Sequence, residues 1–381
     1  MLRAEREGGV KVDNLLDRVQ SVLLLGPGPS PVAPSTYQAL SRPTLGHLDP
    51  FFIEIMDEIK ANLAIVFGTG NTFTIPISGT GSAGMETAFV NTIEKGDRVL
   101  VLANGVFGNR MIDVATRLGA EVDVLNFPWG QPVSIDQAAD KLKQNRYKIV
   151  AMVHAETSTG VLNPAKEIGD LLRSTDSLYL LDCVTSLCGM PVEVDSWHVD
   201  ICYAGSQKCL SCPPGIAPIT FSDRAMEKIT NRASKVPNWY LDMNLLTAYW
   251  ASASRVYHHT APINILYGLY QSLYNVLEEG LDKVFRRHQQ AHTRLIAGLD
   301  AMGWEMLVEE PYRLPMLNTV KVPQGIDEKA LRAKLRDQYL IEVGSGLGDL
   351  AGKVIRIGLM GYGAKEENVD RLLNAIREIL K

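Results

Sequence analysis

A lysine and an aspartate stand at the ends of two hydrophobic runs in the middle of this chain. Lys208 lies in AGSQKCLSCPPG, where small and polar residues surround it directly after the run DICYAG. Asp182 is the last residue of the hydrophobic run LYLLD. A carboxylate at the end of a buried strand is usually kept because a cationic group faces it. A helix cap or a turn residue is the alternative role for Asp182.

A glycine-rich loop supplies a third candidate. The run SGTGSAGMETAFV follows the strand-like FTIPIS, opens a helical pattern and satisfies G-x-G-x-x-G. A dinucleotide site also needs an acidic residue at the end of the next strand, but RVLVLAN ends in Asn104. We therefore expect the loop to bind a phosphate at a helix N-terminus, with Thr80 and Ser82 as hydroxyl donors. A tight turn without a ligand is the alternative.

These three features together fit pyridoxal phosphate. In enzymes that use it, a lysine forms an imine with the cofactor, an aspartate pairs with the pyridinium nitrogen and a loop holds the phosphate. We assign the first two roles to Lys208 and Asp182, which are the expected catalytic residues. Phe107, in ANGVFGNR past a strand end, is a candidate to stack on the ring, and a core aromatic is its alternative role.

The elements that must position these residues alternate along the chain. Seven apolar, β-branched runs begin at FTIPIS and end at IAPITF, and amphipathic helical patterns separate several of them. Such alternation predicts an α/β fold with a mostly parallel, seven-stranded sheet between helices. In the preceding helix, we expect Asp49 to be the N-cap and Pro50 the first residue. From about residue 280 the runs WEMLV, NTVKV and KVIRIG with two helical patterns predict a smaller α/β domain.

Composition narrows the class of protein. The 381 residues carry a formal net charge of -5, which gives no reason to expect a nucleic-acid partner. No apolar stretch is long enough to span a bilayer and the start lacks the apolar middle of a signal peptide, so we expect a cytoplasmic enzyme. The clustered cysteines could form a metal or dithiol site, but we expect buried free thiols and no metal. These are Cys183, Cys188, Cys202, Cys209 and Cys212.

Several motifs resemble the alanine:glyoxylate aminotransferases of the class V aminotransferase family. They are LLLGPGPSPV, SGTGSAGMETAFVN, ANGVFGNR, HAETSTGVLNP, LLDCVTSLCGMP, SQKCLSCPPG, YHHTAP and VIRIGLMG, and the resemblance runs from about residue 20 to the C-terminus. It implies the aspartate-aminotransferase-like type I fold and a homodimer with shared active sites. It also implies an N-terminal arm over residues 1–20, a large cofactor domain over 21–279 and a small C-terminal domain over 280–381.

The resemblance assigns a role to further residues. Arg356, a lone charge in the apolar run VIRIG, is expected to clamp the α-carboxylate of the substrate, and an exposed face of an edge strand is its alternative. The backbone of Gly26 is expected to line the same pocket. Tyr257 and Thr260 are expected to reach the phosphate from the partner subunit. The expected cofactor-binding set is Thr80, Gly81, Ser82, Phe107, Ser158, Asp182, Gln207, Lys208, Tyr257 and Thr260.

The implied reaction moves an amino group from L-alanine to glyoxylate, giving pyruvate and glycine by a ping-pong mechanism. Serine is an alternative donor, because Ser82 stands where the animal alanine enzymes carry histidine and the stretches WGQ and SWHVD resemble serine:glyoxylate relatives. 3-Hydroxykynurenine and 2-aminoethylphosphonate transaminases share the scaffold. A noncatalytic protein that binds pyridoxal phosphate is the alternative outside enzymes. A cysteine desulfurase is disfavoured because the second domain has no cysteine in a flexible loop.

Overall fold

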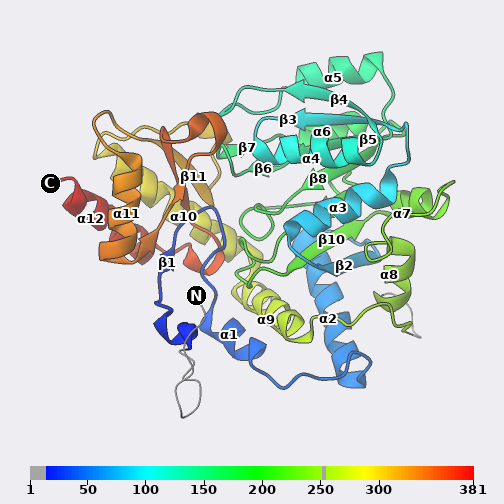
Figure 1. Cartoon of the computed structure of the whole chain (residues 1–381). Helices are drawn as coiled ribbons and strands as arrows, with labels where there is room; N and C mark the ends of the chain where they lie inside the picture. Colours follow the sequence, from blue (N-terminus) through cyan, green and yellow to red (C-terminus); the bar gives the residue numbers. More distant parts are fainter. Residues whose placement is uncertain (1–13, 251–254) are drawn as a thin grey trace, which may run out of the picture.

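The computed structural model describes residues 14–250 and 255–381 of the chain, arranged in a larger and a smaller unit (Figure 1). The larger unit contains helices α1 (Pro34–Leu40), α2 (Pro50–Phe67), α3 (Gly81–Thr92), α4 (Val106–Arg117), α5 (Ile135–Gln144), α6 (Ala165–Leu172), α7 (Asp223–Thr230), α8 (Met243–Trp250) and α9 (Ile263–Glu279). The smaller unit contains α10 (Leu281–Asp300), α11 (Glu328–Tyr339) and α12 (Glu366–Ile379). None of the helices in the described part of the chain is both long and apolar enough to cross a membrane.

A seven-stranded sheet forms the centre of the larger unit. Its strands, in spatial order, are β2 (Phe73–Ser78), β10 (Ile216–Phe221), β9 (Ile201–Tyr203), β8 (Leu178–Asp182), β5 (Ile149–Val153), β3 (Arg98–Ala103) and β4 (Glu121–Asn126). Only the pairings of β10, with β2 and with β9, are antiparallel. The prediction of a mostly parallel seven-stranded α/β sheet is confirmed. Two short strands, β6 (Ala155–Glu156) and β7 (Val161–Leu162), form a hairpin beside it.

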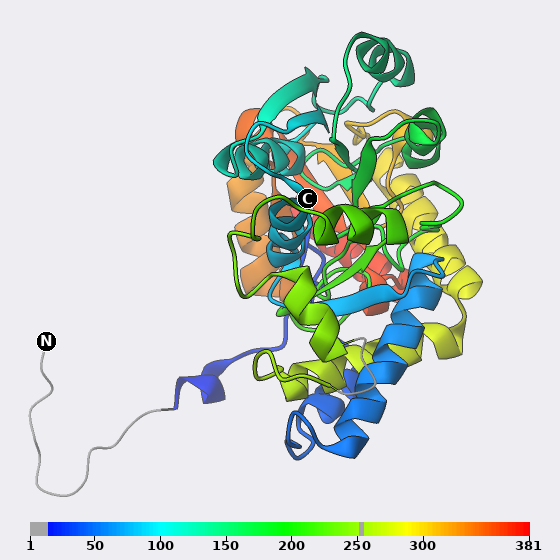
Figure 2. The same cartoon turned by 90° about the vertical axis from the view of Figure 1, so that its right-hand side faces the viewer.

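Helices cover the sheet on both sides (Figure 2). Strands β3, β5, β8 and β10 have buried interiors, as expected for a sheet enclosed by helices. Helix α2 begins as expected, because the Asp49 carboxylate accepts a hydrogen bond from the Phe51 N–H at 2.9 Å and Pro50 is its first residue. The helix ends at Gly68, whose φ of 60° favours glycine.

The smaller unit has its own sheet and a second hydrophobic cluster. Strand β14 (Val354–Gly358) lies between β11 (Leu317–Lys321) and β13 (Gly344–Ser345), and both pairings are antiparallel. The run WEMLV forms only an isolated bridge, between Met306 and Val320. Strand β1 (Leu23–Leu24) pairs with β12 (Ile341–Glu342), and Leu25 is part of the second cluster. The chain therefore enters the smaller unit before it builds the larger one. The boundary at 279/280 stays a prediction.

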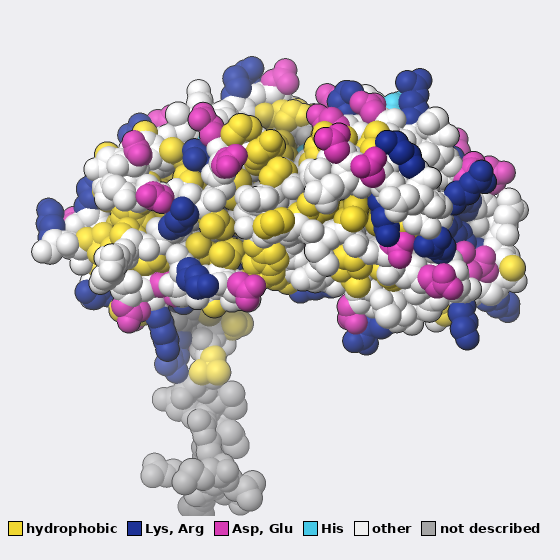
Figure 3. Space-filling view, turned by 90° about the horizontal axis from the view of Figure 1, so that it is seen from above, with side chains coloured by type: hydrophobic (Ala, Val, Ile, Leu, Met, Phe, Trp, Pro, Cys, Tyr) yellow, Lys and Arg dark blue, Asp and Glu magenta, His cyan; other side chains and the backbone are white. Residues whose placement is uncertain are grey.

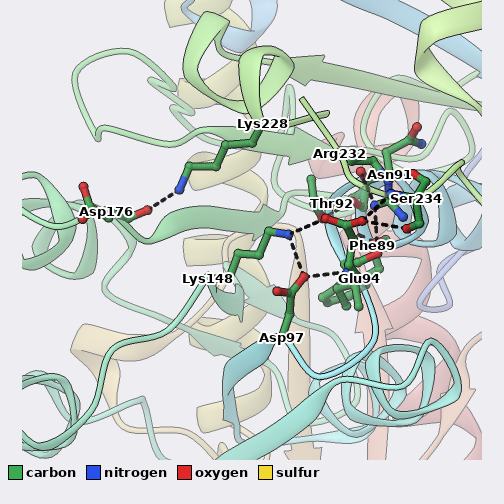
Figure 4. Close-up of polar contacts among 12 residues, drawn as sticks. Phe89, Asn91, Thr92, Glu94, Asp97, Lys148, Asp176, Lys228, Arg232 and Ser234 are labelled. Carbon is green, nitrogen blue, oxygen red and sulfur yellow. Dashed lines mark hydrogen bonds and ion pairs between the residues drawn. The ribbon is translucent and has the colours of Figure 1, made fainter. Parts of the chain in front are cut away.

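A polar network at the end of α3 fixes the segment that follows α7 (Figure 4). Arg232 donates to the carbonyl oxygens of Asn91 and Ile93, both at 2.8 Å. The Glu94 carboxylate accepts the Ser234 hydroxyl at 2.7 Å and its N–H at 2.8 Å. The Ser234 hydrogen bonds, together with Lys148, lower the pKa of Glu94 to about 2. Because the charged form is the bound form, this network stabilises the fold only while Glu94 is ionised.

We predict that Ser234→Ala lowers the free energy of unfolding by about 1 kcal/mol at pH 7. The folded pKa of Glu94 lies below its ordinary value of 4.5, so its contribution is present above pH 4.5 and is lost as the pH falls through about 2. Urea unfolding of wild type and variant should show their difference shrinking over that range. Ser41→Ala removes a hydroxyl bonded to the Gln38 carbonyl and should give a difference that does not change with pH. A constant difference for Ser234→Ala would contradict the assignment.

Candidate active site

Lys208 lies in the turn between β9 and β10, with its amine turned toward the segment that follows β1. The Lys208 Nζ donates to the backbone oxygen of Pro27, and a Cβ on Gly28 would lie 2.7 Å from Nζ. Ser30 holds the two segments together, since its N–H donates to the Gln207 oxygen at 2.9 Å and its hydroxyl to the Lys208 oxygen at 2.7 Å. Burial lowers the pKa of Lys208 to about 8. An appreciable fraction of the amine is therefore neutral and nucleophilic near neutral pH.

Asp182 ends β8, one strand away from the turn that carries Lys208. Its carboxylate accepts the Tyr203 hydroxyl at 2.7 Å and the Val184 N–H at 2.8 Å. Burial nevertheless raises the pKa of Asp182 to about 7, against the effect of these two donors. A protonated pyridine nitrogen beside this carboxylate would offset the cost of burying its charge.

The glycine loop after β2 leaves donors free at the start of α3. Gly79 has a φ of 148°, and the Thr80 side chain makes no capping hydrogen bond. The Ala83 N–H donates to the Thr80 oxygen at 2.7 Å, and among the described residues no hydrogen bond uses the N–H groups of Gly81 and Ser82, which can bind an anion. A Cβ on Gly81 would lie 3.0 Å from Val184 Cγ2, so the loop packs beside the segment that follows Asp182.

Gln207 and Ser82 lie at the same end of the site. The amide oxygen of Gln207 is buried and has no hydrogen-bond partner among the described residues. It lies against Gly205, where a Cβ would be 2.8 Å away, and Gly205 also borders Val184. Ser82 is exposed on α3, where its hydroxyl accepts from Arg110 at 3.5 Å. A phosphate cannot partner this oxygen, because both only accept hydrogen bonds, so the N–H groups at the start of α3 are the donors that suit a phosphate here.

Ser158 and Phe107 are joined by a buried carboxylate that the sequence analysis missed. The Glu156 Oε1 accepts the Ser158 hydroxyl at 2.5 Å and its N–H at 3.1 Å. Its Oε2 accepts the N–H groups of Phe107 at 3.1 Å and Gly108 at 3.2 Å. Glu156 therefore fixes both the start of α4 and the Ser158 hydroxyl, which in turn accepts the Val106 N–H at 2.9 Å.

A cationic side chain, that of Arg110, lies against the ring of Phe107. The Arg110 guanidinium lies over the ring, 5.1 Å from its centroid. Phe107 is partly buried against the core rather than enclosed in it. This position, at the start of a helix and next to Ser158, suits a ring that stacks on a planar ligand.

Arg356 is buried on the middle strand of the smaller sheet, so the alternative of an exposed edge strand is wrong. Its Nη1 donates to the Thr157 oxygen at 3.0 Å and its Nε to the Ser345 oxygen at 2.7 Å. Burial lowers the pKa of Arg356 from its ordinary value. These bonds place the guanidinium beside the turn that carries Ser158. Gly26 packs its backbone on Gly358, two residues further along β14.

Tyr257 and Thr260 lie on the loop before α9, away from Lys208. Their side-chain oxygens are 3.3 Å apart, and both residues are exposed. Within the described residues neither side chain makes a hydrogen bond to the groups around Lys208. Their role toward a partner subunit stays a prediction.

Two of the missed residues carry a signal in the sequence. Glu156 is a lone carboxylate in the small polar stretch HAETSTG, directly after a strand, as Asp182 is after its own. Tyr203 is the one aromatic residue of DICYAG and pairs with Asp182 in the sheet register. Their partners lie 48 and 21 residues away, so the sequence does not reveal the contacts.

Comparisons with known proteins identify the family. The model of the class V aminotransferases matches residues 35–372. Alanine–glyoxylate aminotransferase from Mus musculus is 40% identical over 95% of this chain and 88% of its own length. The structure of alanine–glyoxylate aminotransferase from Nostoc sp. superposes with a TM-score of 0.93 at 47% identity, covering 97% of this chain and all of that one. Ureidoglycine–glyoxylate aminotransferase from Bacillus subtilis has the same TM-score at 39% identity, covering 95% and 93%.

The chain belongs to the class V aminotransferase family. It is an aminotransferase that depends on pyridoxal phosphate, as the sequence predicted. The residues present fit this cofactor, since the N–H groups at the start of α3 suit a phosphate and the buried Asp182 carboxylate suits a pyridinium. All five cysteines are free and buried, consistent with small core residues.

A large cleft in the described structure is not lined by Lys208. It has a volume of about 1030 Å³ and lies between the larger unit and residues 307–312 of the smaller one. Trp129, Trp197, His154 and Tyr312 are among its lining residues. Hydrophobic side chains gather over the middle of the upper face of the molecule, with charged side chains around them (Figure 3). The stretches WGQ and SWHVD therefore border this cleft and not the Lys208 amine.

We predict that Glu156→Gln lowers the free energy of unfolding by about 1 to 3 kcal/mol and weakens binding of pyridoxal phosphate. An amide has one accepting oxygen, so either the Phe107 and Gly108 N–H groups or the Ser158 donors lose their partner. Urea unfolding and cofactor titration of the apoprotein measure the two effects. Glu167→Gln, on the exposed face of α6, is the matched control and should change neither. Equal behaviour of the two variants would contradict the role of Glu156.

Proposed function

We propose that this enzyme transfers the amino group of L-alanine to glyoxylate, giving pyruvate and glycine. The observation that carries the proposal is the pair of buried groups Lys208 and Asp182 at neighbouring strand ends, with pKa values of about 8 and 7. The alanine–glyoxylate aminotransferases named above, 40% and 47% identical, support the choice of substrates.

Some of the expected site residues would bind the ring of the cofactor and others its phosphate. Lys208 would hold it covalently, Asp182 would pair with the ring nitrogen and Phe107 would stack on the ring. Thr80, Gly81, Ser82 and Gln207 would bind the phosphate, and Ser158 would bond the ring hydroxyl. When bound, pyridoxal phosphate supplies an electron sink that weakens the Cα–H bond of an amino acid.

The amine of Lys208 then acts as the general base. Its Nζ would take the Cα proton of the bound amino acid, and its lowered pKa makes the neutral amine more available near pH 7 than that of an ordinary lysine. Burial between Pro27 and Gly28 confines the amine to one side of the site. Arg356 would bind the α-carboxylate, and its bonds to the Thr157 and Ser345 oxygens fix the direction of its fork. Gly26 would contribute its backbone to the same pocket.

Several amino donors carry the groups that this site would bind. Serine, 3-hydroxykynurenine and 2-aminoethylphosphonate all carry the amine that Lys208 requires. The ureidoglycine–glyoxylate relative from Bacillus subtilis adds a further amino donor with glyoxylate as acceptor. Alanine is preferred because alanine–glyoxylate enzymes account for both the Nostoc and the Mus musculus relatives.

We predict that L-alanine bleaches the visible absorption band of the holoenzyme and that glyoxylate restores it. Lys208→Ala should reduce turnover by about 10²- to 10⁴-fold, since the general base is lost. Lys228→Ala, whose amine only bonds the Asp176 oxygen on the surface, is the matched control. Serine and ureidoglycine are tested in the same way. A band that no amino acid bleaches would favour the noncatalytic alternative, and a band bleached only by another donor would replace alanine.

We further propose that the enzyme is a homodimer with shared active sites. The described part of the N-terminal arm projects from the body of the molecule (Figure 2). Its apolar Leu15, Leu16 and Val19 are 67%, 75% and 75% exposed, and an apolar arm in water is typical of a segment that packs on a partner. Residues 1–13 of the arm lie outside the described residues. The division at 279/280 and the cytoplasmic location stay predictions.

We predict that mixed dimers recover activity if Tyr257 and Thr260 serve the partner's site. One subunit carries Lys208→Ala and the other carries Tyr257→Phe with Thr260→Ala, each with its own affinity tag. The intact Lys208 then receives an intact loop from the other chain, so one site of two works and activity should be about half that of wild type. Each variant alone is the control. No recovery would mean that the loop serves the site of its own chain.

A further inference from the structure

Two adjacent histidines connect the loop of Tyr257 to the end of strand β2. The ring nitrogens His258 Nδ1 and His259 Nδ1 are 2.8 Å apart. On one side, His258 Nε2 lies 3.2 Å from the Trp239 backbone oxygen. On the other, His259 Nε2 lies 3.1 Å from the Ser78 hydroxyl. The four groups form one continuous line of hydrogen bonds.

Simple donor and acceptor rules give this line a direction when both imidazoles are neutral. The Trp239 oxygen only accepts, so His258 carries its proton on Nε2 and accepts at Nδ1. His259 must then donate from its Nδ1, which leaves its Nε2 as an acceptor. The Ser78 hydroxyl is therefore a donor to His259. Burial and the neighbouring His258 lower the pKa of His259 to about 4, which agrees with a neutral ring.

Aromatic rings hold both imidazoles in place. The Trp239 ring stacks on His258 with centroids 4.3 Å apart and planes at 17°. The rings of Tyr240 and Tyr249 lie 4.8 and 5.9 Å from His259. Each histidine is therefore fixed by packing as well as by hydrogen bonds, so the Nδ1 to Nδ1 contact does not depend on a mobile side chain.

The Ser78 end of the line and the two histidines in its middle adjoin predicted phosphate donors. Ser78 is the last residue of β2 and is followed directly by the loop of Thr80 and Gly81. His258 and His259 separate Tyr257 from Thr260 in the sequence. Arg255 anchors the same loop by donating to the Trp250 oxygen at 2.9 Å. The loop is thus tied at its start by an arginine and in its middle by the histidines.

We propose that His258 and His259 are positioning residues that hold the Tyr257–Thr260 loop in register with the phosphate loop through the Ser78 hydroxyl. The proposal rests on the proposed function, in which these loops bind the cofactor phosphate. The histidines do not touch the cofactor themselves. They set where the Tyr257 and Thr260 hydroxyls lie, and in the proposed homodimer they link the phosphate loop of one subunit to the phosphate donors it offers its partner.

The test compares apoprotein binding of pyridoxal phosphate with that of pyridoxal, which lacks the phosphate. Equilibrium dialysis gives both dissociation constants without any turnover. His259→Phe keeps an aromatic ring against Tyr240 and Tyr249 but removes both ring nitrogens, and Ser78→Ala removes only the donor. Each should reduce the preference for pyridoxal phosphate over pyridoxal by about five- to tenfold, the effect of one or two hydrogen bonds.

Two further variants separate positioning from general damage. Ser78→Thr retains the hydroxyl and should keep the wild-type preference. His198→Asn changes a histidine near the surface that pairs with Asp170 and should also keep it. If His259→Phe and Ser78→Ala weaken both ligands equally, or leave the preference unchanged, the positioning role is wrong while the phosphate site stands. If wild type itself does not prefer pyridoxal phosphate, the phosphate site fails and the positioning role fails with it.

Discussion

The site depends on the burial of ionisable groups at the carboxyl ends of parallel strands. Water is excluded from Lys208 and Asp182, and burial is the largest cause of the shift in both pKa values, downward for the amine and upward for the carboxyl group. The two shifts bring the pKa values of both groups near neutral pH. A cofactor with a carbonyl carbon and a cationic ring nitrogen suits both groups, because its carbonyl carbon would bond the neutral amine of Lys208 and its ring nitrogen would pair with the Asp182 carboxylate.

A second buried carboxylate organises the protein part of the site. Glu156 uses both oxygens on backbone and hydroxyl donors, and these donors belong to Phe107, Gly108 and Ser158. The ring-stacking position and the Ser158 hydroxyl therefore cannot move independently. The same turn binds Arg356 through the Thr157 oxygen, so the smaller unit is attached at this point. The turn that follows β6 therefore connects the residues expected to contact the cofactor ring with Arg356, which is expected to bind the substrate carboxylate.

The fold was predictable where the signal is local and was not where it depends on distant pairing. The run LYLLD became β8 and IAPITF became β10, because unbroken apolar runs of this length suit strands enclosed by helices. The pairing of Leu23 with Ile341 joins residues over 300 positions apart, and no local pattern announces it. Likewise VIRIG reads as a strand, but its place in the middle of the sheet is decided by β11 and β13.

The site shows the same division between chemistry and geometry. Lys208, Asp182 and the glycine loop were found because their residue types are unusual for their surroundings. The histidine pair was not, because two histidines in a loop look like ordinary polar residues until Ser78, Trp239 and the rings around them are in place. The direction of each hydrogen bond depends on the whole line. Because the Trp239 oxygen can only accept, the proton of His258 must lie on Nε2, and this fixes the donor and the acceptor in every other bond of the line. Such a line transmits position rather than charge, since it is complete only while each ring keeps the tautomer that its neighbour requires.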